Sequence, residues 1–530
     1  MRRCFTCSAF PPSVRPVAHA VARTPEESAG ISLSPPARQL WAAVIILVVL
    51  SGLIFRWAEW ASDRSLWLDE AALAQNIVEQ PVSELARGRL VNHQVAPAGF
   101  MLAVRAVTAV AGSDERALRF VPFLASTIFL LSFVWLAWRR LGPPAALAAA
   151  ALTAWSWPLL RYAGEFKQYS TDTLVALLLF AVAPGLLTHP LTWRRAVALA
   201  AGGVAALVFS QPAIFLLAAL GTLAWVSAAR QQQWPEWRRW TTVGIVWVVF
   251  LAGQLSLNYG TGLGDPLLAD YHREAFLHFW PPAVFAQVLR TGVFDSWVWL
   301  TCAQAWWLWL ALLVFGAWMG WQQARAETVF IALTLFWLGM ASALGVYPLV
   351  GRLLLFLAPL LFWLIARGVR ELARGLHGRA APVVAVLLAL PLWPMASDAL
   401  TEARQPRAPE HLRPVVGQLA QLAHPGDLIL VWPHTRFAFA YYWPRMAHGE
   451  VAVATAPLNP DVPEPAEQMA AKLATLTRGH ERVWLVLTHF EYGEQMNNLR
   501  QLIAVLRADY PRVEEFTPRD GSARGLEFSR

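Results

Sequence analysis

The sequence of 530 residues is poor in cysteine, in lysine and in charged residues of every kind. Three cysteines do not suggest a framework of disulfide bonds, and the isolated pair Cys4 and Cys7 lacks the second pair that a zinc site needs. Charged residues make up 15% of the chain, whereas soluble proteins carry roughly 25%. Lysine occurs only at Lys167 and Lys472, so the net charge of +8 is almost wholly arginine. This composition excludes an ordinary soluble protein, and the positive charge need not indicate a nucleic-acid partner.

Apolar residues dominate the chain. They make up 57% of it, and the 28 tryptophans suit helix ends at membrane interfaces. Charge-free runs of about 20 residues recur between Leu40 and Ser397, and a helix of that length spans a bilayer core of about 30 Å. The sequence therefore predicts a polytopic α-helical membrane protein with about eleven spanning helices, at residues 40–58, 120–138, 142–160, 173–191, 196–210, 213–229, 240–257, 297–318, 328–346, 350–366 and 380–396.

The positions of arginine predict the topology. Residues 1–39 are polar and rich in arginine, without a clear signal-peptide cleavage site, so we expect a disordered cytoplasmic tail. Segment 97–112 is short for a span and contains Arg105, so it either crosses the membrane or lies on its surface. The surface alternative places the arginines of the later loops inside, as the positive-inside rule requires. Four segments then lie outside the cytoplasm: 59–119, 161–172, 258–296 and everything after Asp398.

The last part of the chain, residues 398–530, is long enough for a small domain after a transmembrane domain of residues 40–397. Its pattern predicts a soluble α/β domain on the periplasmic or extracellular side. We expect helices at 412–422, 466–476 and 494–508, strands at 427–432 and 482–487, and a hairpin of 512–516 with 525–529 around the turn at Asp520 and Gly521. No catalytic constellation is visible in it, so we expect a scaffold or a module that docks the acceptor.

The sharpest candidate site is the pair of carboxylates at Asp69 and Glu70, just after the first predicted span. Their neighbours Leu66, Trp67 and Leu68 are apolar, and partial burial raises the pKa of a carboxylate toward the range of a general base. The alternative is that the two carboxylates begin a helix as capping residues. The two interpretations are compatible, because a capping residue can also be catalytic.

A second polar cluster follows the third predicted span, at residues 161–172. Ionisable groups at membrane depth are costly and often functional, although these residues also form an ordinary interfacial charge set. Carboxylates of the two loops are able to hold a divalent cation, Mg²⁺ or Mn²⁺, if the fold brings them together. The candidates here are Glu165 and Asp172 as supporting or metal-binding residues, Lys167 as a phosphate ligand and Tyr169 as a weaker substrate contact.

The third cluster is Tyr347 and Arg352, at the outer end of the tenth predicted span. A guanidinium grips phosphate bidentately, and Arg352 stands where the phosphate of a membrane lipid would lie. The alternative is an arginine that extends to lipid headgroups without a specific role. His93 and Gln94, before the surface segment, are weaker candidates for substrate contact.

Taken in order, these motifs resemble the GT-C membrane glycosyltransferases, specifically the bacterial branch related to protein O-mannosyltransferases and the lipid A aminoarabinose transferase. The similarity covers residues 40–400 and depends on the order in which the motifs follow one another along the chain. The matching pieces are Trp67–Ala71, Ala96–Phe100, Gly112–Arg119, Glu165–Asp172 and Tyr347–Pro359.

The resemblance implies an inverting hexosyl- or pentosyltransferase in the cell (inner) membrane, with a polyprenyl-phosphate-linked sugar as donor. The acceptor, a lipid, glycan or protein, stays open. Asp69 inherits the role of a base or of a metal-linked catalyst, and either Glu165 or Asp172 inherits a supporting role. A different class stays open as well: a transporter or flippase of a lipid-linked or polar substrate. That class would place charges near the middle of spans, whereas here they cluster at outer helix ends.

Overall fold

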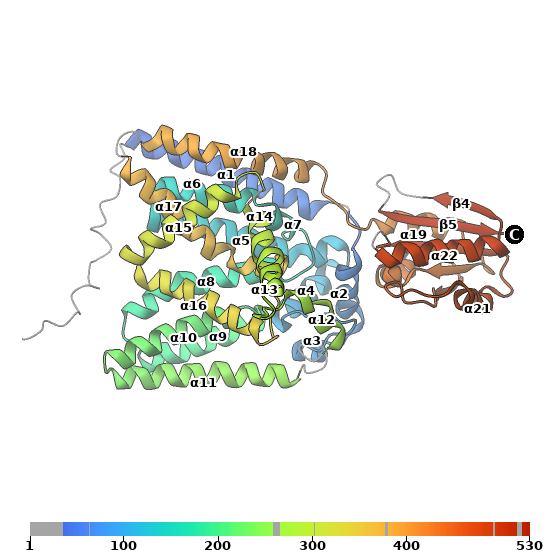
Figure 1. Ribbon diagram of the computed structural model, residues 1–530, viewed down its shortest axis with the longest axis horizontal. Coiled ribbons are helices and arrows are strands. Elements are labelled where there is room, and N and C mark those ends of the chain that lie inside the picture. The colour runs from blue at the N-terminus through green and yellow to red at the C-terminus, as the bar shows by residue number, and fades with distance from the viewer. Residues whose placement is uncertain are drawn as a thin grey trace, which may run out of the picture.

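The structure is a computed structural model that describes residues 35–62, 64–257, 265–301, 303–376, 380–490, 493–516 and 522–530. Most of the predicted cytoplasmic tail, with Cys4 and Cys7, lies outside these residues, as does the predicted turn at Asp520 and Gly521. Two parts are evident in Figure 1, a bundle of long helices and a smaller unit with a sheet at one end of it.

The bundle confirms a polytopic helical membrane fold. Within the described residues, seven stretches are long and apolar enough to span a membrane. They are α1 (Pro35–Ala61), α5 (Glu115–Leu141), α8 (Tyr169–Thr188), α10 (Ala213–Arg230), α11 (Trp234–Leu257), α16 (Arg325–Ala343), and η4 (Gly351–Leu357) with α17 (Ala358–Gly375). Two further helical stretches meet at a bend of 100°, and counting them as one span gives an eighth. The first stretch, Pro282–Thr301, contains α13 (Pro282–Val288), η3 (Leu289–Phe294) and α14 (Asp295–Thr301), and the second is α15 (Trp306–Gln323).

Two of the other predicted spans, 142–160 and 196–210, form helices that are too short for that criterion. Residues 142–160 form α6 (Pro143–Trp155) and α7 (Trp157–Arg161), because the chain turns at Ser156 and Pro158 begins a new helix. Residues 196–210 lie in α9 (Trp193–Phe209), and 380–396 lie in α18 (Ala380–Arg404), which continues past the predicted domain boundary.

Close packing fixes the helix that follows Arg352. A Cβ atom at Gly316 of α15 would lie 1.9 Å from the carbonyl oxygen of Leu364 in α17, so only glycine allows this approach. Gly368 of α17 makes the reciprocal approach to α15, where an added Cβ would lie 2.3 Å from the carbonyl oxygen of Leu312. The middle of α17, the helix that continues from η4, is thereby packed directly against α15.

Residues 59–119, which the sequence predicts to be the first outer loop, contain α2 (Leu68–Glu79), α3 (Val82–Arg87) and α4 (Ala98–Ala111) at the end of the bundle that faces the sheet unit (Figure 1). Helix α12 (Pro266–Tyr271), followed by η2 (Arg273–Ala275), lies at the same end. The predicted surface segment is α4, whose 14 residues extend about 21 Å, short of a bilayer core. Its Arg105 donates to the carbonyl oxygen of Ile77 in α2.

The C-terminal unit is the expected α/β structure. Its five-stranded sheet has the order β2-β1-β3-β5-β4, with parallel pairing of β1 to β2 and β3 and antiparallel pairing of β5 to β3 and β4. The strands are β1 (Leu428–Val431), β2 (Ala452–Thr455), β3 (Arg482–Thr488), β4 (Arg512–Phe516) and β5 (Ala523–Ser529). The helices are α19 (Leu412–Leu422), η6 (Pro433–Thr435), α20 (Arg436–Met446), α21 (Ala466–Thr477) and α22 (Gly493–Asp509). Of these elements, β2, η6 and α20 were not predicted.

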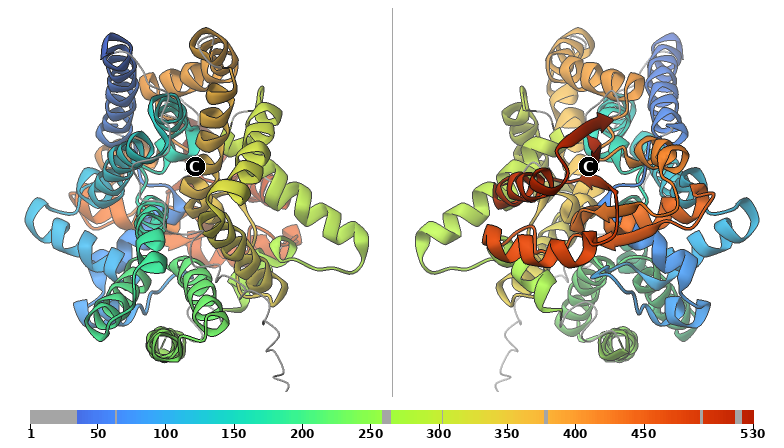
Figure 2. Two further views of the ribbon diagram at one scale, coloured as in Figure 1. Left: turned by 90° about the vertical axis from the view of Figure 1, so that its left-hand side faces the viewer. Right: turned by 90° about the vertical axis from the view of Figure 1, so that its right-hand side faces the viewer.

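One apolar core joins this unit to the bundle. Leu73 of α2, Phe100 of α4 and Phe166, which follows α7, belong to the same buried cluster as Val415 of α19 and Tyr442 of α20. Seen from the end of the molecule, the C-terminal unit lies in front of the bundle (Figure 2, right). The loops with the predicted site residues are therefore packed between the two parts.

Candidate active site

Three predicted residues from three distant segments meet at the start of α2. Asp69 is the second residue of that helix, and its Oδ2 atom lies 3.0 Å from Nη1 of Arg352 in η4. The same oxygen lies 3.6 Å from Nζ of Lys167, in the turn before α8. We call Asp69, Lys167 and Arg352 the Asp69 cluster. The contact of Asp69 with Lys167 places the two loops on one side of the membrane, as expected if α4 does not cross.

The electrostatics of the cluster follow from burial and from its two cations. Burial raises the pKa of Asp69, but Lys167 and Arg352 outweigh it, so the pKa is lowered and the carboxylate is ionised. Burial lowers the pKa of Lys167, and Asp69 only partly offsets this effect. Asp69 and Arg352 keep 21% and 26% of their side chains exposed, so an incoming group can reach them. Because the cluster has one negative and two positive side chains, its positive charge is in excess and suits it to binding an anion.

Polar and aromatic side chains surround this cluster. Lys167 donates to Oε1 of Gln94 at 2.8 Å, which brings that weaker candidate into the site. The guanidinium of Arg352 lies 5.9 Å from the ring centre of Trp67. Tyr169 packs edge-on against Tyr162 at 4.9 Å between ring centres, and both lie within electrostatic range of Arg352.

Two other candidates have different surroundings. The ring nitrogen Nδ1 of His93 lies 2.7 Å from the carboxylate of Asp265, so this histidine joins the first outer loop to the residues before α12. The hydroxyl of Tyr347 donates to the carbonyl oxygen of Leu353 at 2.9 Å. Tyr347 thus supports the backbone of η4, which positions Arg352, rather than reaching the cluster itself.

Glu70 has a very different environment from its neighbour Asp69. It is buried, and Arg119 donates to both of its carboxylate oxygens, at 2.8 and 2.6 Å. The backbone N–H of Phe166 donates to it as well, at 2.6 Å. Burial opposes ionisation, but Arg119 outweighs it and lowers the pKa of Glu70. This carboxylate ties the two loops together, which favours a structural role over the predicted catalytic one.

The remaining acidic candidates form no ion pair with the cluster, although Glu165 lies within electrostatic range of Lys167 and Arg352. Glu165 is buried and accepts from Nε of Arg161 at 3.0 Å, and Asp172 is buried in the first turn of α8, within electrostatic range of Tyr347. In the described part of the chain, no three His, Cys, Asp or Glu side chains lie together in a way that could hold a metal ion. Asp69 is the one carboxylate of its cluster, and two cations already contact it. The described residues therefore form no ready-made set of ligands for the Mg²⁺ or Mn²⁺ that the sequence left open.

Three contributors were missed by the sequence interpretation. Trp67 and Tyr162 belong to the motifs already singled out, but only the fold shows that they flank Arg352. His272, directly after α12, lies within electrostatic range of both Asp69 and Arg352. Nothing in its local sequence marks it, because the loop that contains it approaches the site only in three dimensions.

Searches for relatives by sequence find none: no family model matches the chain, and no curated protein matches it. Solved structures do match. ArnT from Cupriavidus metallidurans bound to undecaprenyl phosphate matches with a TM-score of 0.52 and 14% identity, over 92% of this chain and 97% of that one. An oligosaccharyltransferase from Archaeoglobus fulgidus, in complex with Zn and sulfate, matches with 0.50 and 13%, over 91% and 72%.

The chain has the GT-C fold. The resemblance inferred from the motifs is confirmed at the level of fold, and the chain is a multi-pass membrane protein. In this fold the three residues of the cluster come from three elements: Asp69 from the start of α2, Lys167 from the turn before α8 and Arg352 from the start of η4.

Proposed function

We propose that the chain is a glycosyltransferase that moves a sugar from a polyprenyl-phosphate carrier to an acceptor on the outer face of the cell membrane. The observation that carries the proposal is the Asp69 cluster, in which one ionised carboxylate contacts two cations at the ends of apolar helices. The structural likeness to ArnT, a protein solved with undecaprenyl phosphate, supports a lipid phosphate as the ligand. The N-terminus is then cytoplasmic, and the C-terminal unit is periplasmic or extracellular.

The first role of the cluster is to bind the donor. Arg352 offers a planar pair of N–H donors and Lys167 a point charge, which together neutralise the phosphate that links the sugar to its lipid. Because both cations contact Asp69 in this structure, a bound phosphate competes for them. That competition raises the pKa of Asp69 and makes its carboxylate a stronger base only when the donor is present.

The second role is the transfer. Asp69 accepts the proton of an acceptor hydroxyl or amine while the acceptor oxygen or nitrogen forms a bond to C1 of the sugar. The bond between C1 and the phosphate oxygen breaks, and the electron pair leaves with the polyprenyl phosphate. Arg352 and Lys167 stabilise the charge of that leaving group. A single displacement of this kind inverts the configuration at C1.

The test uses purified full-length protein in lipid nanodiscs, with undecaprenyl-phosphate-hexose and undecaprenyl-phosphate-pentose as probes and a cell-envelope extract as the source of acceptor. We expect free undecaprenyl phosphate to be released from one donor, and this release to slow by roughly 10²–10⁴-fold when Asp69→Asn replaces the wild type. In sealed proteoliposomes, movement of the intact donor across the membrane without any release would instead support a flippase and overturn the proposal.

A further inference from the structure

Helix α2, which presents Asp69, lacks a cap from its own sequence. Its N-cap residue is Trp67, whose side chain accepts no hydrogen bond, although the first N–H groups of a helix need acceptors. The N–H of Leu68, the residue before Asp69, donates instead to Oε2 of Glu410 at 3.1 Å. The helix that positions the proposed base is therefore capped by a residue more than 300 positions later.

Glu410 is itself held by the C-terminal unit. It is buried, with 2% of its surface exposed, and lies between the end of α18 and the start of α19. The hydroxyl of Thr488, the last residue of β3, donates to it at 3.1 Å, and Nδ1 of His489 lies 3.2 Å away. The bond to Glu410 raises the pKa of His489 against the effect of burial. One carboxylate thus joins the start of α2 to the end of β3.

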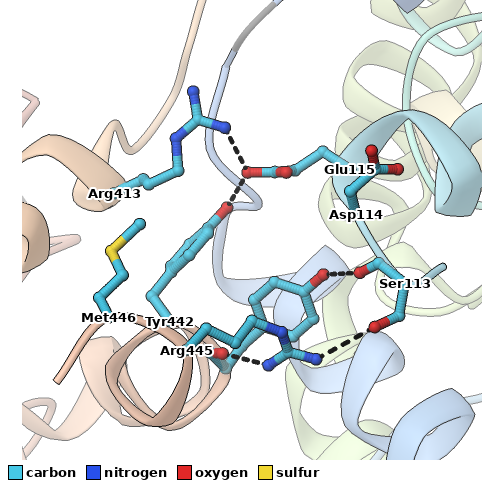
Figure 3. A pocket seen from close by; sticks show the side chains of 8 residues that line it. Ser113, Asp114, Glu115, Arg413, Tyr442, Arg445 and Met446 are labelled. Atoms are coloured by element: carbon cyan, nitrogen blue, oxygen red, sulfur yellow. Dashed lines mark hydrogen bonds and ion pairs between the residues drawn. The ribbon is translucent and has the colours of Figure 1, made fainter. Parts of the chain in front are cut away.

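The two residues that lead into α2 are fixed from the same side. The N–H of Ser65 donates to Nδ1 of His411 at 3.3 Å, and the N–H of Leu66 donates to the hydroxyl of Tyr442 at 2.7 Å. That hydroxyl donates in turn to Glu115 at the start of α5 (Figure 3). A cavity of about 340 Å³ lies at this junction, and Glu115, Arg413 and Tyr442 are among the side chains that line it (Figure 3).

The second loop of the site contacts the same stretch of chain. Nε1 of Trp157 donates to Oε2 of Glu402 at 2.9 Å, and Arg161 donates to the carbonyl oxygen of Arg407. We call residues 402–413 the linker segment. Through separate residues it bonds to the loop before Asp69 and to α7, which precedes the turn that contains Lys167.

We propose that the linker segment holds the two loops of the Asp69 cluster in register, with Glu410 as the positioning residue that sets the place of Asp69. The C-terminal unit is then a structural part of the active site, in addition to any contact that it makes with an acceptor. Displacing a catalytic group by about 1 Å can lower a rate by on the order of 100-fold, so such a cap has catalytic consequences. The catalytic part of this inference rests on the proposed function, whereas the positioning part does not.

The test compares full-length Glu410→Leu and Glu410→Gln in nanodiscs by hydrogen–deuterium exchange. The leucine removes every acceptor, so we expect amides 66–72 to exchange at least about 10-fold faster. The glutamine keeps an acceptor oxygen for the N–H of Leu68 and should restore most of the protection. We also expect Glu410→Leu to release undecaprenyl phosphate about 10- to 100-fold more slowly, while its affinity for that lipid changes less than about 3-fold, because both cations stay in place.

The matched control is Asp427→Asn. Asp427 is another buried carboxylate of the C-terminal unit, which accepts from Arg482 and Trp484 at 3.0 and 2.9 Å and does not contact the first outer loop. Its replacement should loosen the sheet and leave amides 66–72 protected. The inference is overturned if Glu410→Leu leaves those amides unchanged, or if the control exposes them equally. Should the wild type release no lipid at all, the proposed function fails, but the exchange data still decide the positioning role.

Discussion

Replacing Asp69 by Asn should have opposite effects on the two proposed roles of the Asp69 cluster. The amide cannot accept a proton, so transfer should fall by roughly 10²–10⁴-fold, the range for the loss of a general base. Binding of undecaprenyl phosphate should nevertheless become tighter, because the substitution removes the carboxylate that competes for Lys167 and Arg352.

The size of the gain follows from the distances. Arg352 lies 3.0 Å from the Asp69 carboxylate, and a phosphate held on the other side of that guanidinium at about 2.8 Å would lie about 6 Å from it. At an effective dielectric constant of about 20, two negative charges at that distance repel by roughly 3 kcal/mol. Partial exposure of both side chains reduces this to on the order of 1–2 kcal/mol, or about 10-fold in affinity.

The assay is native mass spectrometry of the purified protein titrated with undecaprenyl phosphate, in parallel with donor turnover. Asp270→Asn serves as the control, because Asp270 is an exposed carboxylate that, within the described part of the chain, forms an ion pair with Arg273 alone. It should alter neither property. Weaker binding by Asp69→Asn, in a protein that remains folded, would refute the claim that the carboxylate and the phosphate share the same two cations.

Three further outcomes are expected. Burial lowers the pKa of Lys167 below 10.5, the ordinary value for lysine, and only the charged form of Lys167 binds the phosphate. Affinity for undecaprenyl phosphate should therefore be lost, as pH rises, at a pH below 10.5. Lys167→Arg should keep its affinity to higher pH, because arginine stays charged. Glu70→Gln leaves the buried Arg119 without its counter-charge and should lower the free energy of unfolding by about 3–5 kcal/mol, measured by denaturation in detergent, while the double variant Glu70→Gln with Arg119→Met should recover part of it. Tyr442→Phe leaves the buried N–H of Leu66 without its acceptor and should lower the melting temperature, by an amount equivalent to about 1–3 kcal/mol.

The sequence was sufficient to find the Asp69 cluster because charge is scarce in this chain. Asp69, Lys167 and Arg352 stand next to long apolar runs, where an ionisable group is costly and therefore conspicuous. The same argument did not separate Asp69 from Glu70. The two are adjacent in sequence, yet one is partly exposed between two cations and the other is buried against Arg119, and only the fold decides which.

Long-range contacts explain most of what the sequence did not predict. Glu410 is an ordinary acidic residue of a linker, and its role depends on the backbone of Leu68, to which no local pattern connects it. Helix α20 contains Pro444 and a run of aromatic residues without helical periodicity, so the sequence pattern does not predict it. Strand β2 has four largely exposed residues and gives no alternating pattern. By contrast, β1 and β3 are continuous apolar runs, and both were predicted.

The central claim is that Arg352 and Lys167 together bind a polyprenyl phosphate beside Asp69. The most direct measurement is the affinity of the full-length protein in nanodiscs for undecaprenyl phosphate, compared between the wild type and the double variant Arg352→Gln with Lys167→Gln. The account predicts saturable binding by the wild type and at least about a 100-fold loss in the folded double variant. Equal affinity of the two proteins would contradict it.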